Sequence, residues 1–293
     1  MAPCRTIRTM SWQTSRYRID LSRPRVMGIV NVTPDSFSDG GLHANTRAAV
    51  AHCEALVAQG ADILDIGGES SRPGTAPVPL DQELARVLPV LREAVMLGVP
   101  VSVDTYKPVV MRQALDVGAD IINDIWALRQ PGAREAVAVH GRCGVCLMHM
   151  HGEPQTMQRS PMEGDAVPQV LAFLKAQTAA LQALGVDSAR ITWDPGIGFG
   201  KTVEQNFALL ARQAELLAGG YPLLAGWSRK SSLGNVTGQP VNDRLEASVT
   251  AAVLAVERGA RIVRVHDVRE TVAALKVLSA TISIAKKPTE TTS

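Results

Sequence analysis

The sequence predicts an α/β fold, a (β/α)8 TIM barrel with a short N-terminal hairpin or extension. From residue 26 to residue 280, short β-branched runs alternate with longer Ala-, Leu- and Glu-rich segments of helical period. This alternation is typical of βαβ units and a parallel sheet. The runs number eight, and a chain of 293 residues suits a barrel that folds as one domain.

The eight runs are expected to be the strands of the barrel. They are Val26–Asn31, Asp62–Ile66, Val99–Asp104, Asp120–Asp124, Gly144–Met148, Arg190–Asp194, Tyr221–Gly226 and Arg261–His266. A helix-like stretch follows each of them. Residues 26–285 are therefore expected to form the barrel domain, with residues 1–25 as the extension and residues 286–293 as a disordered tail.

Helix ends are marked by capping residues. Asn45-Thr46 precede a helix expected over Arg47–Gln59, and Asn242-Asp243 precede one expected over Arg244–Arg258, because their side-chain oxygens can cap free N–H groups. Glycines that adopt the left-handed conformation are expected to end helices, namely Gly60, Gly98, Gly118, Gly185 and Gly259.

Composition excludes several classes of protein. The net charge is only +2 and no basic run occurs in the body of the chain, so neither nucleic acid nor a membrane is expected as a partner. No apolar stretch reaches membrane-span length. Four scattered cysteines are too few for a disulfide framework and indicate a reducing, cytoplasmic location. The Arg-rich first 25 residues are also compatible with a transit peptide, but a hairpin is the favoured interpretation.

Polar side chains are dense at the predicted strand ends, where barrel enzymes place their chemistry. They are Asn31, Asp65, Glu69, Asp104, Asn123, Asp124, His149, Asp194, Ser228, Lys230, Arg264 and His266. Two long Gly-, Pro- and Ser-containing loops, Thr33–Asn45 and Gly67–Pro79, follow the first two strands. We expect these loops to be mobile covers.

Eight motifs in order resemble those of the dihydropteroate synthase family. They are Met27–Gly41 (MGIVNVTPDSFSDGG), Asp65–Gly74 (DIGGESSRPG), Ser102–Thr105 (SVDT), Ile122–Asp124 (IND), Leu147–Met150 (LMHM), Asp194–Lys201 (DPGIGFGK), Ser228–Ser231 (SRKS) and Arg264–Asp267 (RVHD). The resemblance runs from about residue 20 to residue 280. One small departure is Ser71, where the family usually carries Thr.

The resemblance implies a pterin site. A pterin presents an amino-pyrimidinone edge of fixed donors and acceptors, which buried carboxylates and amides can read with paired hydrogen bonds. The family assigns this role to Asp104, Asn123, Asp194 and Lys230, as both binding and catalytic residues, with Met148 and Phe199 beside the ring. Any one of these acids alone could instead cap a helix.

The resemblance also implies a diphosphate site and a 4-aminobenzoate site. Asn31, Arg264 and His266 would bind diphosphate, and Asn31 would also be a ligand of Mg²⁺. Because the pterin and diphosphate residues are expected to lie apart, Arg264→Ala should spare binding of the bare pterin. The 4-aminobenzoate site is expected to comprise Phe37, Ser71, Arg72, Pro73 and Ser228.

The activity that follows is condensation of 6-hydroxymethyl-7,8-dihydropterin diphosphate with 4-aminobenzoate, giving 7,8-dihydropteroate in folate biosynthesis. The resemblance further implies a homodimeric transferase and a sulfonamide target. Two other interpretations stay open. A methyltetrahydrofolate-dependent methyltransferase would share the pterin residues but needs no diphosphate site, and a catalytically silent barrel would serve as a partner subunit.

Three other motifs have simpler explanations. Pro195–Thr202 nearly matches a P-loop, but proline replaces its first glycine and lacks the N–H that cradles phosphate. Cys143 and Cys146 have redox spacing, yet residues three apart on a strand face opposite sides. His149 and His151 could offer two imidazoles to a metal, although packing of His149 beneath the pterin is favoured.

Overall fold

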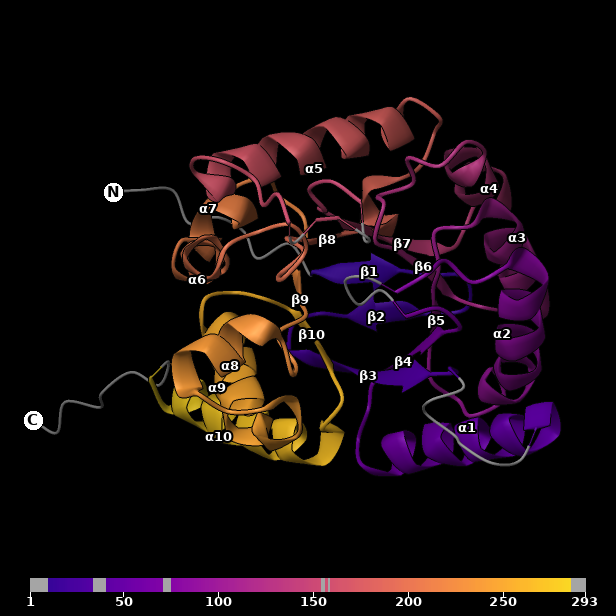
Figure 1. Ribbon diagram of the computed structural model, residues 1–293, viewed down its shortest axis with the longest axis horizontal. Helices are drawn as coiled ribbons and strands as arrows, with labels where there is room; N and C mark the ends of the chain where they lie inside the picture. Colours follow the sequence, from indigo (N-terminus) through magenta and orange to yellow (C-terminus); the bar gives the residue numbers. More distant parts are fainter. Residues whose placement is uncertain (1–9, 34–40, 71–74, 154–155, 158, 286–293) are drawn as a thin grey trace, which may run out of the picture.

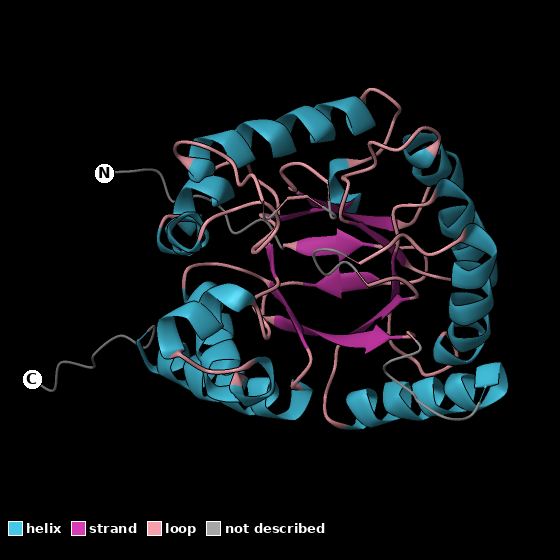
Figure 2. Ribbon diagram, viewed as in Figure 1, coloured by secondary structure: helices cyan, strands magenta, loops and turns pink. Residues whose placement is uncertain are grey.

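A computed structural model describes residues 10–33, 41–70, 75–153, 156–157 and 159–285. Eight parallel strands form one sheet in the order β8-β7-β6-β5-β4-β3-β10-β9. Helices surround this sheet on its outer side (Figures 1 and 2). The predicted (β/α)8 architecture is confirmed.

The sheet strands are β3 (Arg25–Asn31), β4 (Ile63–Gly67), β5 (Val101–Asp104), β6 (Ile121–Asp124), β7 (Gly144–Met148), β8 (Ile191–Asp194), β9 (Leu224–Ala225) and β10 (Ile262–Val265). The helices are α1 (Gly41–Ala58), α2 (Leu80–Ala94), α3 (Pro108–Val117), α4 (Ala133–His140), α5 (Ala166–Gln182), α6 (Val203–Ala211), α7 (Gln213–Leu217), α8 (Ser231–Thr237), α9 (Leu245–Glu257) and α10 (Val268–Ala285). Short 3-10 turns cover Ser188–Arg190 and Val241–Asp243.

The ring closes between β8 and β9. An isolated parallel bridge joins Trp193 to Leu223, and the Trp193 N–H donates to the carbonyl of Pro222 at 2.9 Å. The strand expected over Tyr221–Gly226 is wrong in length, because only Leu224–Ala225 is a regular strand. Pro222 has no N–H to donate to a neighbouring strand, which shortens the ladder there.

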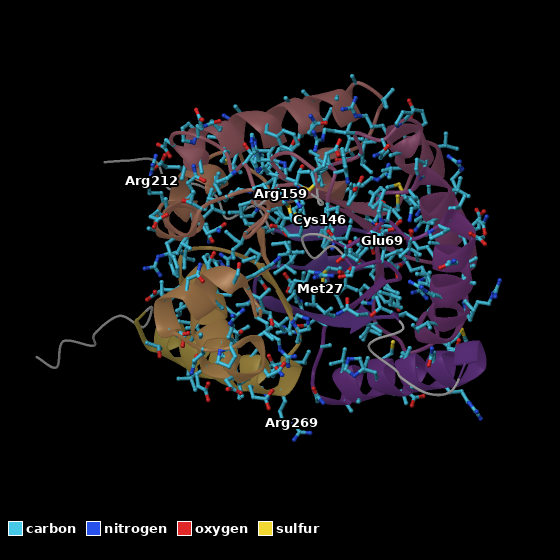
Figure 3. All side chains as sticks on the ribbon, viewed as in Figure 1. Met27, Glu69, Cys146, Arg159, Arg212 and Arg269 are labelled. Atoms are coloured by element: carbon cyan, nitrogen blue, oxygen red, sulfur yellow. The ribbon has the colours of Figure 1, made fainter. Side chains whose placement is uncertain are left out.

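Side chains inside the barrel are apolar near the amino-terminal ends of the strands. Successive residues of a strand face opposite sides of the sheet, so every second residue points inward, and the inward side chains of alternate strands stack in layers. Inward residues of six strands at this end form one buried cluster with Trp12, Ile19 and Leu21 from the N-terminal segment. They are Met27, Ile63, Ile121, Cys146, Leu224 and Ile262. Figure 3 shows Met27 and Cys146 near the middle of the molecule.

An antiparallel hairpin covers this end of the barrel. It pairs β1 (Ser11–Gln13) with β2 (Arg18–Asp20) and lies across the centre of the ring in Figure 1. The Trp12 indole N–H donates to the Arg190 carbonyl at 2.8 Å, and Arg16 pairs with buried Asp120 at 2.6 Å. A small molecule must therefore reach the interior from the opposite, carboxyl-terminal end.

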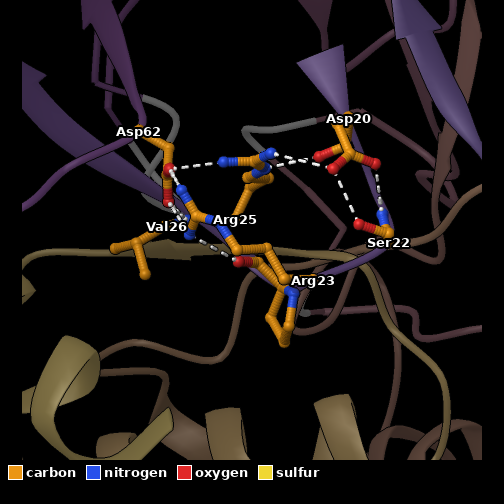
Figure 4. Close-up of polar contacts among 7 residues, drawn as sticks. Asp20, Ser22, Arg23, Arg25, Val26 and Asp62 are labelled. Atoms are coloured by element: carbon orange, nitrogen blue, oxygen red, sulfur yellow. Dashed lines mark hydrogen bonds and ion pairs between the residues drawn. The ribbon is translucent and has the colours of Figure 1, made fainter. Parts of the chain in front are cut away.

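The chain that leaves the hairpin is tied to the barrel by charged pairs (Figure 4). Arg23 and Arg25 both donate to the carboxylate of Asp62, at 2.6 and 3.0 Å. The other Asp62 oxygen accepts from the Val26 N–H at 3.0 Å. These contacts hold the start of β3 against the turn before β4, which fixes where the first strand enters the sheet.

Helix C-terminal ends agree with the sequence, and two N-terminal ends do not. Gly60, Gly98, Gly118, Gly185 and Gly259 all have positive φ, between 77° and 113°, as expected for glycines that end helices. The predicted Asn45-Thr46 cap is wrong, because α1 already begins at Gly41. The Asn242-Asp243 cap is also wrong: both residues lie in a 3-10 turn, a local turn that such residues favour.

Helix α6 begins with a reciprocal cap. The Thr202 side chain accepts from the Gln205 N–H at 3.2 Å, and the Gln205 side chain accepts from the Thr202 N–H at 2.9 Å. Thr202→Ala is expected to lower the free energy of unfolding by about 1 kcal/mol, because it leaves a helix N–H without its acceptor. Urea denaturation would measure this loss. Thr202→Ser keeps the hydroxyl and should retain most of the stability; an equal loss in both variants would contradict the capping role.

Within the described part of the chain, none of the helices combines the length and apolar character that crossing a bilayer requires.

Candidate active site

The interior of the barrel becomes polar one level above its apolar floor. A step of two residues along a strand returns to the same face, so Ile63 is followed inside by Asp65, Ile121 by Asn123, and Ile262 by Arg264. Asp65 is 0% exposed and Asn123 is buried. The polar layer at the carboxyl ends thus follows from strand periodicity, and it faces the end that the hairpin leaves open.

Arg264 lies at the centre of this layer. Its Nε donates to Asp65 Oδ2 at 2.5 Å and its Nη2 donates to Asp104 Oδ2 at 2.7 Å. Asn123 Nδ2 also donates to Asp65 Oδ2, at 3.1 Å. The expectation that the diphosphate and pterin residues lie apart is therefore wrong. The long Arg264 side chain reaches across the barrel to strands β4 and β5.

Asp104 titrates near neutrality. Burial raises the pKa of Asp104 to about 7, against the opposing positive charge of Arg264, while the negative charge of Asp65 adds to the increase. A carboxyl group in this state responds to small changes in nearby charge. Its protonation is consequently linked to whatever binds to Arg264.

Asp194 and Lys230 lie by an apolar wall. Asp194, at the end of β8, is 5% exposed and accepts from the Gly196 N–H at 2.7 Å. Burial raises the pKa of Asp194, while that hydrogen bond opposes the shift. Lys230 Nζ lies 4.2 Å from the centre of the Phe199 ring. Burial, followed by the charge of Arg264, lowers the pKa of Lys230 to about 8.

The apolar wall is a separate buried cluster at this end of the barrel. Its members are Ile125, Met148, Met150, Met157 and Phe199. Two of them, Met148 and Phe199, are residues that the sequence places beside a pterin ring. An apolar surface with a carboxylate and an ammonium group at its edge suits a flat ring with a polar rim.

His266, just beyond β10, contacts Ser228 twice. Ser228 Oγ lies 2.9 Å from His266 Nδ1 and accepts from the His266 main-chain N–H at 3.2 Å. Because a hydroxyl can both donate and accept, this contact is compatible with either tautomer of the His266 ring. Burial, followed by the charges of Arg229 and Arg264, lowers the pKa of His266 to about 3. A neutral imidazole offers one N–H to donate and one nitrogen that accepts.

Asn31 ends β3, and β3 pairs directly with β10. The first and last strands of the sequence-predicted barrel are therefore neighbours, as ring closure requires. Among the described residues, no group of three or more His, Cys, Asp or Glu side chains could hold a metal ion. Mg²⁺ is often bound by one or two protein oxygens together with substrate phosphates and water, so the single amide oxygen of Asn31, at the end of β3, fits this ion.

Four predicted 4-aminobenzoate residues lie outside the described residues: Phe37, Ser71, Arg72 and Pro73. Lys107 contacts the segments on both sides of residues 71–74. Its Nζ donates to Glu69, to Glu83 and to the Val78 carbonyl. Sequence patterns do not single out Lys107, because it follows a strand end by three residues and joins groups that are distant along the chain.

The P-loop-like segment, the cysteine pair and His149 have structural roles. Lys201 Nζ donates to the carbonyls of Gly196, Phe199 and His149, at 2.8, 3.1 and 3.3 Å, so this lysine holds the loop after β8. Cys143 and Cys146 are buried free thiols. His149 is buried and packs edge-on against Phe173, with 4.9 Å between ring centres.

Comparison with known proteins identifies the relatives of this chain. Residues 27–266 match the family described as pterin binding enzyme. A dihydropteroate synthase of Neisseria meningitidis serogroup B is 51% identical over 275 residues, which span 92% of this chain and 96% of that protein.

Solved structures give the same relationship. The Burkholderia cenocepacia dihydropteroate synthase complexed with 7,8-dihydropteroate is 52% identical, with a TM-score of 0.86 over 94% of this chain and 97% of that one. The Yersinia pestis dihydropteroate synthase in a sulfonamide drug complex is 46% identical, with a TM-score of 0.88 over 94% of this chain and 100% of that one. The chain therefore belongs to the pterin binding enzymes and, among them, to the dihydropteroate synthase family.

Proposed function

We propose that this chain is a transferase that condenses 6-hydroxymethyl-7,8-dihydropterin diphosphate with 4-aminobenzoate, giving 7,8-dihydropteroate and diphosphate. The observation that carries the proposal is the Asp104–Arg264 pair in the polar layer. It joins a carboxylate that can accept from a pterin to a guanidinium that can bind a diphosphate. The B. cenocepacia relative was solved with 7,8-dihydropteroate, the product in which the two substrates are joined.

Recognition of the pterin is assigned to Asp104, Asn123, Asp194 and Lys230, with Met148 and Phe199 against the ring. The amino-pyrimidinone edge carries donors that the Asp194 carboxylate can accept. Asn123 uses its Nδ2 on Asp65, so its Oδ1 remains for the ligand. Lys230, whose Nζ lies over the Phe199 ring, supplies a donor to an acceptor of the pterin ring.

The reaction breaks the C–O bond between the pterin methylene and the diphosphate, and the bonding electrons leave with the diphosphate. The ring nitrogens share the positive charge that develops on the methylene. The arylamine nitrogen of 4-aminobenzoate then forms the new C–N bond and releases one proton. Arg264 and the ring of His266 stabilise the negative charge that grows on the leaving group.

Mg²⁺ is the proposed cofactor, with Asn31 as its protein ligand. When bound, it would neutralise part of the diphosphate charge. The 4-aminobenzoate site is assigned to Phe37, Ser71, Arg72, Pro73 and Ser228. Ser228 lies beside His266, which brings this site next to the diphosphate site.

Release of diphosphate from the pterin diphosphate, measured with and without 4-aminobenzoate, tests this function. A dihydropteroate synthase releases diphosphate rapidly only when both substrates are present. A methyltetrahydrofolate-dependent methyltransferase or a silent partner subunit would release none. The placement of Arg264 and His266 together favours the synthase, because a methyltransferase has no use for a diphosphate site.

We expect 4-aminobenzoate to bind only after the pterin and diphosphate are in place. The reason is that Ser228, which is assigned to the 4-aminobenzoate site, contacts His266, which is assigned to the diphosphate site. Diphosphate with Mg²⁺ and pterin should raise 4-aminobenzoate affinity by about fivefold or more, and the reciprocal increase must be the same. Calorimetry on free enzyme, on enzyme with pterin, and on enzyme with pterin, diphosphate and Mg²⁺ would measure it. Equal affinity in all three states would rule out ordered binding.

We further propose a cytoplasmic homodimer. Helix α10 carries exposed apolar side chains, with Val277 70% and Ile282 39% exposed, which suits burial against a second copy. Sulfonamides, which resemble 4-aminobenzoate, are expected to bind in its site, since the Y. pestis relative was solved in a sulfonamide complex.

A further inference from the structure

Asp65 is a buried carboxylate that none of the proposed substrate contacts uses. It is 0% exposed, and it lies one inward level below Asp104, since Asp65 is opposite Ser102 in the register of β4 and β5 and Gly67 is opposite Asp104. A buried charge of this kind is costly unless it is paired. The residues that pair with Asp65 therefore indicate its role.

Both partners of Asp65 belong to the proposed substrate site. Its Oδ2 accepts from Arg264 Nε at 2.5 Å and from Asn123 Nδ2 at 3.1 Å. One oxygen thus contacts a residue assigned to diphosphate and a residue assigned to pterin. The other oxygen, Oδ1, has no hydrogen-bond partner among the described residues.

The contact with Asn123 fixes the orientation of its amide. An ionised carboxylate only accepts hydrogen bonds, so the amide nitrogen must face Asp65 and the amide oxygen must face away from it. A neutral or donating group at position 65 would allow the amide to turn over. Asn123 would then present a donor where the pterin edge requires an acceptor.

The contact with Arg264 fixes the plane of its guanidinium. The five N–H groups of arginine lie in one rigid plane. Asp65 holds Nε and Asp104 holds Nη2, so both the tilt and the rotation of this plane are set. The remaining N–H groups are consequently aimed in one direction.

We propose that Asp65 is a positioning residue: it holds the Asn123 amide and the Arg264 guanidinium in the orientations that bind pterin and diphosphate. This role rests on the proposed function. Asp65 does not touch either substrate, and it acts through the two side chains that do. It also makes the two binding sites depend on one buried charge.

Asp65→Asn tests the proposal, because it removes the charge with little change in size. We expect it to weaken binding of inorganic diphosphate with Mg²⁺, and of a pterin lacking the diphosphate, by about tenfold or more each, as measured by calorimetry. Ser102→Ala is the matched control. Ser102 is buried opposite Asp65, and its hydroxyl has no partner among the described residues, so this variant should bind both ligands as the parent does.

A double-mutant cycle separates positioning from a general effect on the fold. If Asp65 acts through Arg264, Asp65→Asn should change diphosphate affinity less than about twofold when Arg264→Ala is already present. Arg264→Gln, which keeps most of the side-chain volume, is the alternative background if the alanine variant does not fold. An equal loss in both backgrounds, or no loss in either, would overturn the proposal.

These binding measurements need no turnover. Absence of diphosphate release by the parent enzyme would remove the proposed function. Normal turnover in the parent together with unchanged ligand affinities in Asp65→Asn would remove only the role of Asp65.

Discussion

Asp194→Asn is expected to weaken binding of a pterin by about 1.5–3 kcal/mol, which is a factor of roughly ten to one hundred and fifty. The carboxylate is 5% exposed and spends one oxygen on the Gly196 N–H, so only the other remains for the ligand. If the amide oxygen keeps the Gly196 bond, the amide nitrogen faces the pterin. Two donors then face each other without an acceptor between them.

Calorimetry with a pterin that lacks the diphosphate isolates this effect from the anion site. Thr192→Val, one inward level below on β8, is a useful control because the Thr192 hydroxyl is buried and has no partner among the described residues. It should bind the pterin normally. Unchanged pterin affinity in Asp194→Asn would refute the assignment of Asp194 to the pterin edge.

Arg264→Ala is expected to destabilise the fold by about 3 kcal/mol at neutral pH, because it leaves Asp65 and Asp104 buried without their cation. It should also reduce affinity for both diphosphate and the bare pterin, since Arg264 contacts Asp104 at 2.7 Å. This replaces the expectation, drawn from the sequence, that the bare pterin would be spared.

The stability loss in Arg264→Ala should depend on pH in a defined direction. The pKa of Asp104 is about 7 in the folded chain, above the roughly 3.9 of an unfolded aspartate. The folded state therefore holds more protons between these values, and this group makes the fold less stable as pH rises through that window. Arg264 opposes the shift, so removing it should raise the pKa of Asp104 further and make the loss larger at pH 8 than at pH 5.

Urea denaturation of parent and variant at both pH values would measure this difference. Arg212→Ala is the matched control: Arg212 forms ion pairs with Asp165 and Glu215 and lies at the periphery in Figure 3. Exposed pairs contribute little to stability, so this variant should show little change at either pH. A loss in Arg264→Ala that is the same at pH 5 and pH 8 would argue against a role for Asp104.

The sequence predicted which strands exist and which polar residues end them, because both depend on local periodicity. It did not predict the contacts of Arg264 with Asp65 and Asp104, since those contacts depend on how strands 160 and more residues apart meet across the barrel. The sequence-based prediction treated each strand end as an independent site. It therefore assigned Asp104 and Arg264 to separate sites, although they form one ion pair.

The errors in element bounds also have local physical causes. The strand around Leu224 is short because Pro222 cannot donate to its neighbour. The start of α9 is displaced because Asn242 and Asp243 form a 3-10 turn in place of a cap. Phe37, Ser71, Arg72 and Pro73 remain predictions, because they lie outside the described residues.

Among the described residues, β8 and β9 are joined by the isolated Trp193–Leu223 bridge, so opening the ring at this junction breaks few main-chain hydrogen bonds. Asp194 ends β8 on one side of this junction, and Lys230 follows β9 on the other. A pterin bonded to both side chains would act as a cross-link over this sparsely bonded junction. Ligand binding then raises the stability of the whole fold by mass action, and local opening of the junction, measurable by amide hydrogen exchange, becomes rarer in the occupied enzyme.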